Sequence, residues 1–220
     1  MSGRSGVLIV FLLAVGLPDG ARAGKEDRSS PLRISAGMGV SAVNAQDLVV
    51  FIRTLTRVEV SDFKSGVEFF GAAAVPLGGD WSLKLEYAYL LGTYNVGGAF
   101  GAGEFTFRGH LPTLIAQYTL VEEPTYAVRA GGGIGYHAGS LSARYATFTN
   151  EFSAGGPGAK LELEATTAFS REVSAYLGAD FRWDFIGDLK SDEGNGPPGL
   201  ASTSLHFFSA GAKLGFTYSL

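Results

Sequence analysis

The sequence predicts an all-β fold, an antiparallel up-and-down barrel of eight strands. Three observations predict it. Apolar and polar residues alternate with period two from residue 32 onward, the connectors between the alternating segments are short and long in turn, and the charges on the polar face are balanced in sign. Period-two alternation is typical of strands with one apolar and one polar face. The eight segments are 32–43, 65–77, 81–96, 105–121, 126–141, 158–169, 174–188 and 203–220.

Composition excludes several other classes of protein. A chain of 220 residues that is 46% hydrophobic and 17% charged is too apolar to be disordered. With Cys 0, a disulfide framework and a thiolate zinc site are both excluded. The formal net charge of −4 leaves no basic surface for nucleic acid, so we expect no nucleic-acid partner.

The N-terminal residues 1–23 predict a signal peptide. Arg4 precedes an apolar run over residues 7–17, and Ala21-Arg22-Ala23 supplies the small residues that signal peptidase requires. The apolar run is too short for a membrane helix, which takes ~20 residues. We therefore expect cleavage after Ala23, a short periplasmic segment over residues 24–31 and a barrel over residues 32–220.

Segment 32–43 is followed by a long connector, 44–64, that does not alternate. Asn44 to Asp47 are helix N-cap types, and five apolar residues then recur at helical spacing. These are Leu48, Val49, Phe51, Ile52 and Leu55. A ninth strand here would give an odd number, whereas bacterial single-chain barrels have even numbers. The connector therefore predicts a short amphipathic helix, either a lid or foot on the membrane surface or the mouth of an apolar ligand site.

Segments 65–77 and 81–96 form the first predicted hairpin, and the later segments repeat its pattern. In segment 81–96 every second residue from Trp81 to Leu91 is apolar, while Lys84 and Glu86 lie on the other face. Segments 105–121, 126–141, 158–169, 174–188 and 203–220 alternate in the same way. Each therefore predicts a strand with one apolar face.

The connectors distinguish a membrane barrel from a soluble sandwich or a lipocalin-like barrel. Connectors 78–80, 122–125 and 170–173 are short, whereas 44–64, 97–104, 142–157 and 189–202 are long. Short periplasmic turns and long extracellular loops are typical of transmembrane β-barrels. The segments also exceed the ~9–11 residues that cross a bilayer. We therefore predict a transmembrane barrel whose strands project as a rim.

Charged residues on the polar face then point into the lumen. There are six of each sign: Arg33, Glu68, Lys84, Glu86, Arg129, Lys160, Glu162, Glu164, Asp180, Arg182, Asp184 and Lys213. The interior of an eight-stranded barrel is just wide enough for side chains to fill. We expect these charges to pair and to close the lumen. We also expect lumen-facing glycines to leave room for Arg33 or Lys84, namely Gly37, Gly39, Gly131, Gly133 and Gly135.

Aromatic residues gather near the ends of the predicted strands. Beside the short turns are Trp81, Tyr118, Tyr126, Phe169, Tyr176 and Tyr218, and toward the long connectors are Tyr94, Phe107, Tyr136, Tyr145, Trp183 and Phe185. Two aromatic belts that border an apolar band are typical of membrane barrels. We therefore expect both groups to face lipid headgroups.

The C-terminal residues 213–220 resemble the β-signal of bacterial outer-membrane proteins. Lys213, Gly215, Tyr218 and Leu220 carry the resemblance, with leucine at the last position where phenylalanine is most common. The resemblance implies insertion by the barrel assembly machinery from the periplasm. The layout of residues 32–220 resembles small eight-stranded outer-membrane barrels of the OmpA, OmpX and OmpW types. This implies a protein of the Gram-negative outer membrane, in contact with its lipid and lipopolysaccharide.

The predicted role is structural, or an interaction at the cell surface, with a charge-plugged lumen and no cofactor or metal. The histidines His110, His137 and His206 lie on three different segments, and no G-x-S-x-G or H-E-x-x-H motif is present. We therefore expect no enzyme. Two alternatives stay open: a narrow conduit or site for small apolar molecules, as in the OmpW type, and a lipid A-modifying enzyme using His206 and Ser204. The loop sequences name no extracellular partner.

Overall fold

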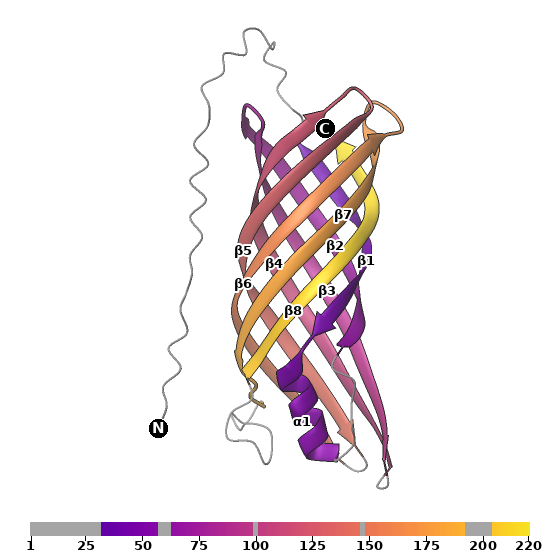
Figure 1. The fold of residues 1–220 in the computed structure, drawn as a ribbon, viewed down its shortest axis with the longest axis vertical. Coiled ribbons are helices and arrows are strands. Elements are labelled where there is room, and N and C mark those ends of the chain that lie inside the picture. The colour runs from indigo at the N-terminus through magenta and orange to yellow at the C-terminus, as the bar shows by residue number, and fades with distance from the viewer. Residues whose placement is uncertain (1–31, 57–62, 99–100, 146–147, 192–203) are drawn as a thin grey trace.

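The chain forms one closed barrel of eight antiparallel strands (Figure 1). The computed structural model describes residues 32–56, 63–98, 101–145, 148–191 and 204–220. Each strand pairs with its neighbours in sequence, and β1 pairs with β8 to close the ring. The elements are β1 Arg33–Asn44, α1 Gln46–Thr56, β2 Phe63–Gly78, β3 Trp81–Gly98, β4 Gly101–Glu122, β5 Tyr126–Tyr145, β6 Phe148–Ala168, β7 Val173–Asp188 and β8 Ser204–Ser219. The predicted fold class is confirmed.

The period-two pattern places polar side chains inside the barrel and apolar side chains outside. In β3, Lys84 is 1% exposed, whereas the adjacent Leu85 is 57% exposed. The other strands show the same alternation of buried and exposed residues. The barrel is therefore inverted relative to a water-soluble protein, with its charges in the core and its apolar residues on the surface.

The strands β3 to β6 run further than the sequence predicts. Gly98 pairs with Gly101 and Tyr145 pairs with Phe148, so most of the predicted connectors 97–104 and 142–157 is strand. Glycines and Pro157 made these stretches resemble loops. Pro157 pairs with β5 one residue before the pairing of β6 with β7 begins at Gly158. Proline is tolerated at such a strand edge because no ladder bond on the open side needs its N–H.

The two ends of the barrel differ. At the turn end, short turns join β2 to β3, β4 to β5 and β6 to β7, and the C-terminus lies at the same end (Figure 1). Gly78 and Gly79 in the first of these turns have φ values of 108° and 58°, which non-glycine residues rarely adopt. At the opposite end, called here the helix end, α1 follows β1 (Figure 1).

Lumen-facing glycines allow close approach of neighbouring strands. Gly37 pairs with Gly215 where β1 meets β8, and a Cβ atom at Gly37 would lie 2.7 Å from the Gly215 Cα. The expectation that these glycines make room for Arg33 or Lys84 is wrong. The atoms nearest to a Cβ at Gly37, Gly39, Gly131, Gly133 and Gly135 belong instead to neighbouring backbone and to Phe70, Lys213, Ile115, Gln117 and His137.

Three predicted belt aromatics lie inside the barrel instead of on its surface. Tyr94, Phe107 and Tyr176 are 3%, 5% and 2% exposed. Their positions share the parity of inward-facing residues, which overrides proximity to a strand end. The remaining belt residues lie outside the lumen, among them the edge-to-face pair Trp81 and Tyr118, except that the side chain of Tyr145 falls outside the described part.

The predicted helix forms as α1. Leu48, Val49 and Ile52 are buried, whereas the side chains of Phe51 and Leu55 fall outside the described part. The Asp47 carboxylate accepts a hydrogen bond from the backbone N–H of His206 at 3.2 Å, which ties the helix to the start of β8. In the described part of the chain, no helix has the length and apolar character to cross a membrane.

Candidate functional site

The lumen contains a polar pocket at the turn end, a network of charged side chains in the middle and an apolar cluster at the helix end. We call these the turn-end pocket, the charge network and the apolar cluster. The charge network is built from inward-facing positions of β2, β3, β5, β6, β7 and β8. Because each of these strands contributes side chains at alternate positions, residues distant in sequence converge in the lumen.

Glu86 lies at the centre of the charge network. Its carboxylate meets Lys160 at 2.5 Å, Lys213 at 2.7 Å and Lys84 at 3.3 Å. The side chains of all four residues are 1–2% exposed. A buried charge is costly unless it is paired, and this carboxylate has three cationic partners.

The charge network extends from Glu86 in both directions. Toward the turn end, Lys84 meets Glu162 at 3.0 Å and Glu164 at 3.1 Å, and Arg129 meets Glu164 at 3.5 Å. Toward the helix end, Lys213 meets Glu68 at 2.6 Å, and Arg182 joins Glu68 at 3.0 Å to Asp184 at 3.3 Å.

Asp180 connects the two directions. It lies 3.0 Å from Lys213 and 3.5 Å from Lys160. Its contacts with the two lysines are ion pairs by distance, because neither carboxylate oxygen forms a hydrogen bond with the described residues. Eleven of the twelve charged residues predicted for the lumen thus belong to one connected set of ion pairs.

Arg33 is the twelfth predicted residue and lies apart from these ion pairs. Its Nη2 donates to the neutral side chains of Ser82, at 3.1 Å, and Gln117, at 3.4 Å. Within the described ranges it forms no ion pair. Arg33 faces the lumen as the sequence predicts, but its partners are uncharged.

The sequence missed several uncharged members of the lumen. Gln117 donates to Glu162 at 2.8 Å and to Glu164 at 2.9 Å, and Lys84 donates to the Tyr176 hydroxyl at 3.4 Å. Inward parity alone was the signal that could have found them.

His137 forms a buried chain with two other residues the sequence did not group. Its Nδ1 is hydrogen-bonded to Asp184, and its Nε2 lies 3.1 Å from the Thr113 hydroxyl. A hydroxyl, an imidazole and a carboxylate in this order are also the groups of a nucleophile and its base. Here His137 and Asp184 are fully buried and Thr113 is 2% exposed, so a substrate has no access to the hydroxyl. This hydrogen-bonded chain therefore extends the charge network.

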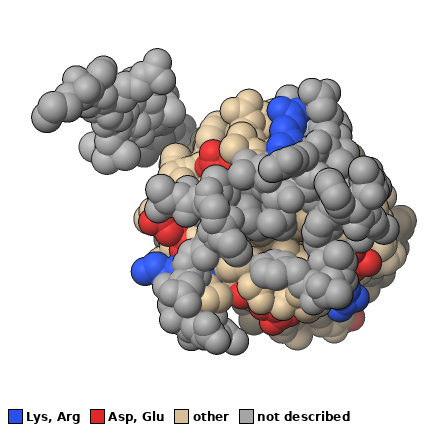
Figure 2. Space-filling model, turned by 90° about the horizontal axis from the view of Figure 1, so that it is seen from below, with Lys and Arg blue, Asp and Glu red and all other residues tan. Residues whose placement is uncertain are grey.

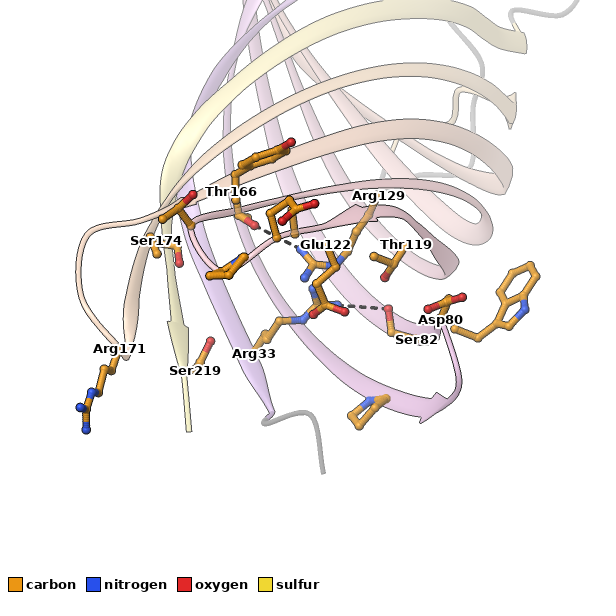
Figure 3. Close-up of a pocket in the computed structure, with 18 of the residues that line it drawn as sticks. Arg33, Asp80, Ser82, Thr119, Glu122, Arg129, Thr166, Arg171, Ser174 and Ser219 are labelled. Carbon is orange, nitrogen blue, oxygen red and sulfur yellow. Dashed lines mark hydrogen bonds between the residues drawn. The ribbon is translucent and has the colours of Figure 1, made fainter. Parts of the chain in front are cut away.

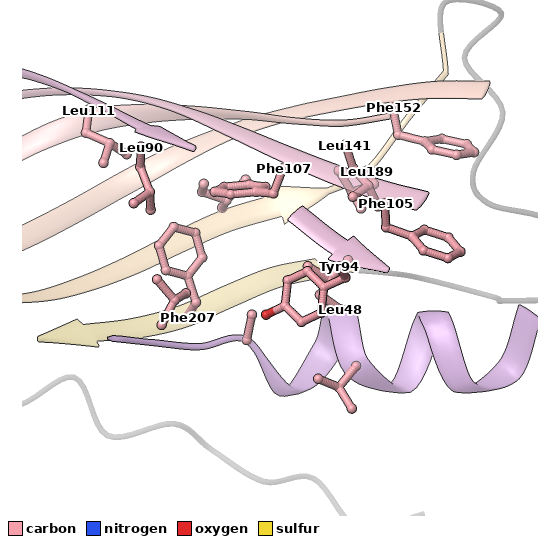
Figure 4. Close-up of a cluster of buried hydrophobic side chains, with 14 of the residues drawn as sticks. Leu48, Leu90, Tyr94, Phe105, Phe107, Leu111, Leu141, Phe152, Leu189 and Phe207 are labelled. Atoms are coloured by element: carbon pink, nitrogen blue, oxygen red, sulfur yellow. The ribbon is translucent and has the colours of Figure 1, made fainter. Parts of the chain in front are cut away.

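The apolar cluster fills the lumen at the helix end (Figure 4). It includes Leu48 and Ile52 from α1 together with Leu90, Phe107 and Phe207 from the strands. The rings of Phe107 and Phe207 meet edge to face at 5.5 Å between centroids. The cavity between α1 and these residues is about 20 Å³, which has room for roughly one water molecule. Among the described residues, the space beneath α1 is therefore small.

The turn-end pocket is the larger cavity, about 290 Å³ in volume (Figure 3). Its walls come from the three short turns and from both strands of the barrel seam, at Arg33 of β1 and Ser219 of β8. Arg33, Arg129 and Ser82 line it, and Asp80, Glu122 and Glu123 come from its turns. The pocket therefore offers both cationic and anionic groups to the solution at this end.

The four β-signal residues lie on β8 and at its end, with different surroundings. Lys213 is buried in the charge network, and Gly215 lies against Gly37 at the seam. The Tyr218 hydroxyl donates to Glu172 at 3.2 Å, and the backbone N–H of Leu220 donates to the Leu32 carbonyl at 2.9 Å. In the folded barrel these residues belong to the β1–β8 closure and its surroundings.

Of the histidines considered for catalysis, His110 and His206 are exposed, whereas His137 is buried. His206 is exposed and its ring meets Phe185 edge to face at 6.1 Å. No group of three or more histidine, aspartate or glutamate side chains in the described residues has a geometry that could hold a metal ion.

Comparisons with known proteins identify the fold. No protein-family model matches the chain, and no curated protein matches its sequence. Among solved structures, Neisserial surface protein A (NspA) superposes with a TM-score of 0.56 at 10% identity, covering 86% of this chain and 97% of NspA. Ail, the attachment invasion locus protein of Yersinia pestis, gives a TM-score of 0.54 at 12% identity, covering 87% of this chain and 99% of Ail. A major outer membrane protein from Thermus thermophilus gives 0.54 at 12% identity, covering 86% and 99%. The chain has the eight-stranded barrel fold of bacterial outer-membrane proteins.

Proposed function

We propose that this chain is an integral protein of the bacterial outer membrane whose lumen is closed by its own side chains, and which acts as a structural or surface-interaction protein. The observation that carries the proposal is the inverted barrel, with charges inside and apolar residues outside. Its outer face exposes Ile34, Val40, Phe69, Leu85, Leu114, Ile134, Leu161, Phe181, Leu214 and Phe216, each at least 45% accessible. An apolar surface on every strand of a closed barrel favours lipid as its surroundings, because soluble monomers rarely expose such continuous patches.

The proposed orientation places the turn end in the periplasm and the helix end outside the cell. Short turns on the periplasmic side are the rule for outer-membrane barrels. The predicted signal peptide over residues 1–23 and the segment 24–31, which lie outside the described residues, agree with export. The resemblance of Lys213, Gly215, Tyr218 and Leu220 to the β-signal supports insertion by the barrel assembly machinery.

The surface at the helix end suits interactions that do not depend on one sign of charge. Figure 2 views this end, where the visible charged side chains lie around the periphery and neither sign forms a single patch. The extended strands β3 to β6 and the helix α1 supply most of the described structure there. This distribution does not favour recognition of a partner through one sign of charge, and it suits contacts with a protein of mixed surface charge.

Two alternative functions are less well supported: a conduit or site for small apolar molecules, and a lipid A-modifying enzyme. The charge network occupies the middle of the lumen and the apolar cluster occupies its helix end, so a conduit for apolar molecules would require α1 to move. Catalysis would require an accessible nucleophile or base with a partner. The hydrogen-bonded chain at His137 is enclosed, and the ring of the exposed His206 packs edge to face against Phe185. We therefore favour a non-enzymatic role.

The electrophoretic mobility of the folded protein tests the barrel in a membrane. Protein extracted in mild detergent should migrate differently on a denaturing gel before and after boiling, because a closed barrel resists the detergent until it is heated. The same protein should fractionate with the outer membrane, and a urea-unfolded sample provides the control mobility. One unchanged mobility, or recovery in the soluble periplasmic fraction, would overturn the proposal.

A further inference from the structure

Arg33 carries a guanidinium group that the described lumen leaves partly unsatisfied. Its Nη2 donates to Ser82 and Gln117, both neutral, while its Nη1 is buried and has no hydrogen-bond partner among the described residues. The other five lumen cations all form ion pairs. A buried charged donor without an acceptor is costly, so this atom favours an anionic acceptor from outside the network.

Arg129 brings a second guanidinium group to the same pocket. Its Nη1 donates to Thr166 at 3.2 Å and lies 3.5 Å from Glu164. The Glu164 carboxylate also accepts from Lys84 at 3.1 Å and from Gln117 at 2.9 Å. One carboxylate thus serves three donors, and Arg129 holds it only at the long distance of 3.5 Å.

The size and lining of the turn-end pocket restrict what it can accept. Its volume of about 290 Å³ suits a small molecule or one end of a larger one. Figure 3 shows Arg33 and Arg129 on the same side of the pocket, with Ser82 bonded to Arg33 and Thr166 to Arg129. Guanidinium groups match the oxygens of carboxylate and phosphate, and the nearby hydroxyls add further hydrogen-bonding capacity.

Acidic residues at the rim of the turn-end pocket would compete with a bound anion for Arg33. Asp80, Glu122 and Glu123 line the pocket from the turns, and the carboxylate of Glu122 is drawn beside Arg33 in Figure 3. These carboxylates repel any anion, and the repulsion grows with the charge of the ligand, so a small oxyanion of low charge is favoured over a polyanion.

We propose that the turn-end pocket binds a small oxyanion, the carboxylate or phosphate group of a molecule that enters from the periplasm, between the guanidinium groups of Arg33 and Arg129. This goes beyond the proposed structural role, because it assigns a ligand site to the end of the barrel opposite α1.

Calorimetric titration of the folded barrel with sodium phosphate and, separately, sodium acetate tests the proposal. The protein should be in a detergent with a neutral sugar headgroup, at constant ionic strength set by chloride. At least one of the two anions should bind saturably, and the one that binds identifies phosphate or carboxylate as the ligand chemistry. Arg33→Gln and Arg129→Gln should each weaken binding by about tenfold or more, because each removes charged hydrogen-bond donors.

Three further variants act as controls. Arg171→Gln removes a cation that also lines the pocket but points away from Arg33 and Arg129 in Figure 3, so it should change the affinity less than about twofold. Arg33→Lys keeps the charge without the planar guanidinium and should bind more tightly than Arg33→Gln. Glu122→Gln should strengthen binding, because it removes a competing negative charge.

The change in gel mobility on heating shows that each variant is folded and is independent of anion binding. The proposal is overturned if neither anion binds saturably to the wild-type barrel, or if Arg33→Gln and Arg171→Gln bind with the same affinity. In either case the heat-dependent mobility would still support the membrane barrel.

Discussion

At the scale of single residues, the lumen shows how many partners one buried charge can require. Glu86 forms ion pairs with three lysines, which come from β3, β6 and β8. Removing one member of such a network is costly, since it leaves other charges buried without compensation. The stability of the barrel therefore depends on individual inward-facing residues more than on individual outward-facing ones.

We expect Glu86→Gln to lower the free energy of unfolding by about 3–5 kcal/mol, because Lys84, Lys160 and Lys213 lose the carboxylate charge that all three share. Urea unfolding of the refolded barrel, followed by tryptophan fluorescence, measures the change. The matched substitution Glu151→Gln, at an exposed position of β6, should change it by less than about 0.5 kcal/mol. Equal effects of the two substitutions would contradict the inward placement of Glu86.

At the scale of elements, α1 closes one end of the barrel with its apolar face. Leu48, Val49 and Ile52 are buried against the strands, whereas Val50 is 53% exposed. The helix is too short to be stable by itself, so its packing against the apolar cluster holds it in place. The position of α1 on the barrel therefore depends on its buried side chains.

We expect Ile52→Ala to loosen α1 from the barrel by about 2–5 kcal/mol, because Ile52 is fully buried in the apolar cluster. Native-state hydrogen exchange of the α1 amides would show the loss as faster exchange, with the strand amides unchanged. Val50→Ala is the control on the same helix and should leave exchange almost unaffected. If both variants exchange alike, α1 does not pack as described.

At the scale of the whole molecule, the lumen contains two different kinds of contact. Ion pairs occupy the middle of the lumen, and apolar side chains occupy the helix end. An eight-stranded barrel has an interior that side chains can fill, and these residues occupy it. The molecule thus combines a polar core with an apolar exterior, which suits a position within a bilayer.

We expect the folded protein to show no stable conductance in planar bilayers, because ions would have to break the ion pairs and pass the apolar cluster. Single-channel recording measures this, with detergent alone as the blank and a wide-lumen porin as the positive control. Large, steady conductance steps from the purified barrel would show that the lumen is open.

The sequence by itself determined the number of strands, the alternation of inward and outward positions along each strand, the helix after β1 and the identity of the lumen charges. These follow from period-two alternation, which is a local property of each strand. Strand length was less predictable, because glycines and Pro157 mimic a loop where β6 is only partly paired.

Only the tertiary structure decided which charges form ion pairs and which other side chains contact one another in the lumen. Lys84 reaches Glu162 and Lys213 reaches Glu86 across the lumen, and such contacts depend on barrel closure and on the register between strands far apart in sequence. The same closure joins His137 to Asp184 and leaves Arg33 facing the turn-end pocket. Alternation in one strand fixes the direction of a side chain, but its partners come from the other strands of the ring.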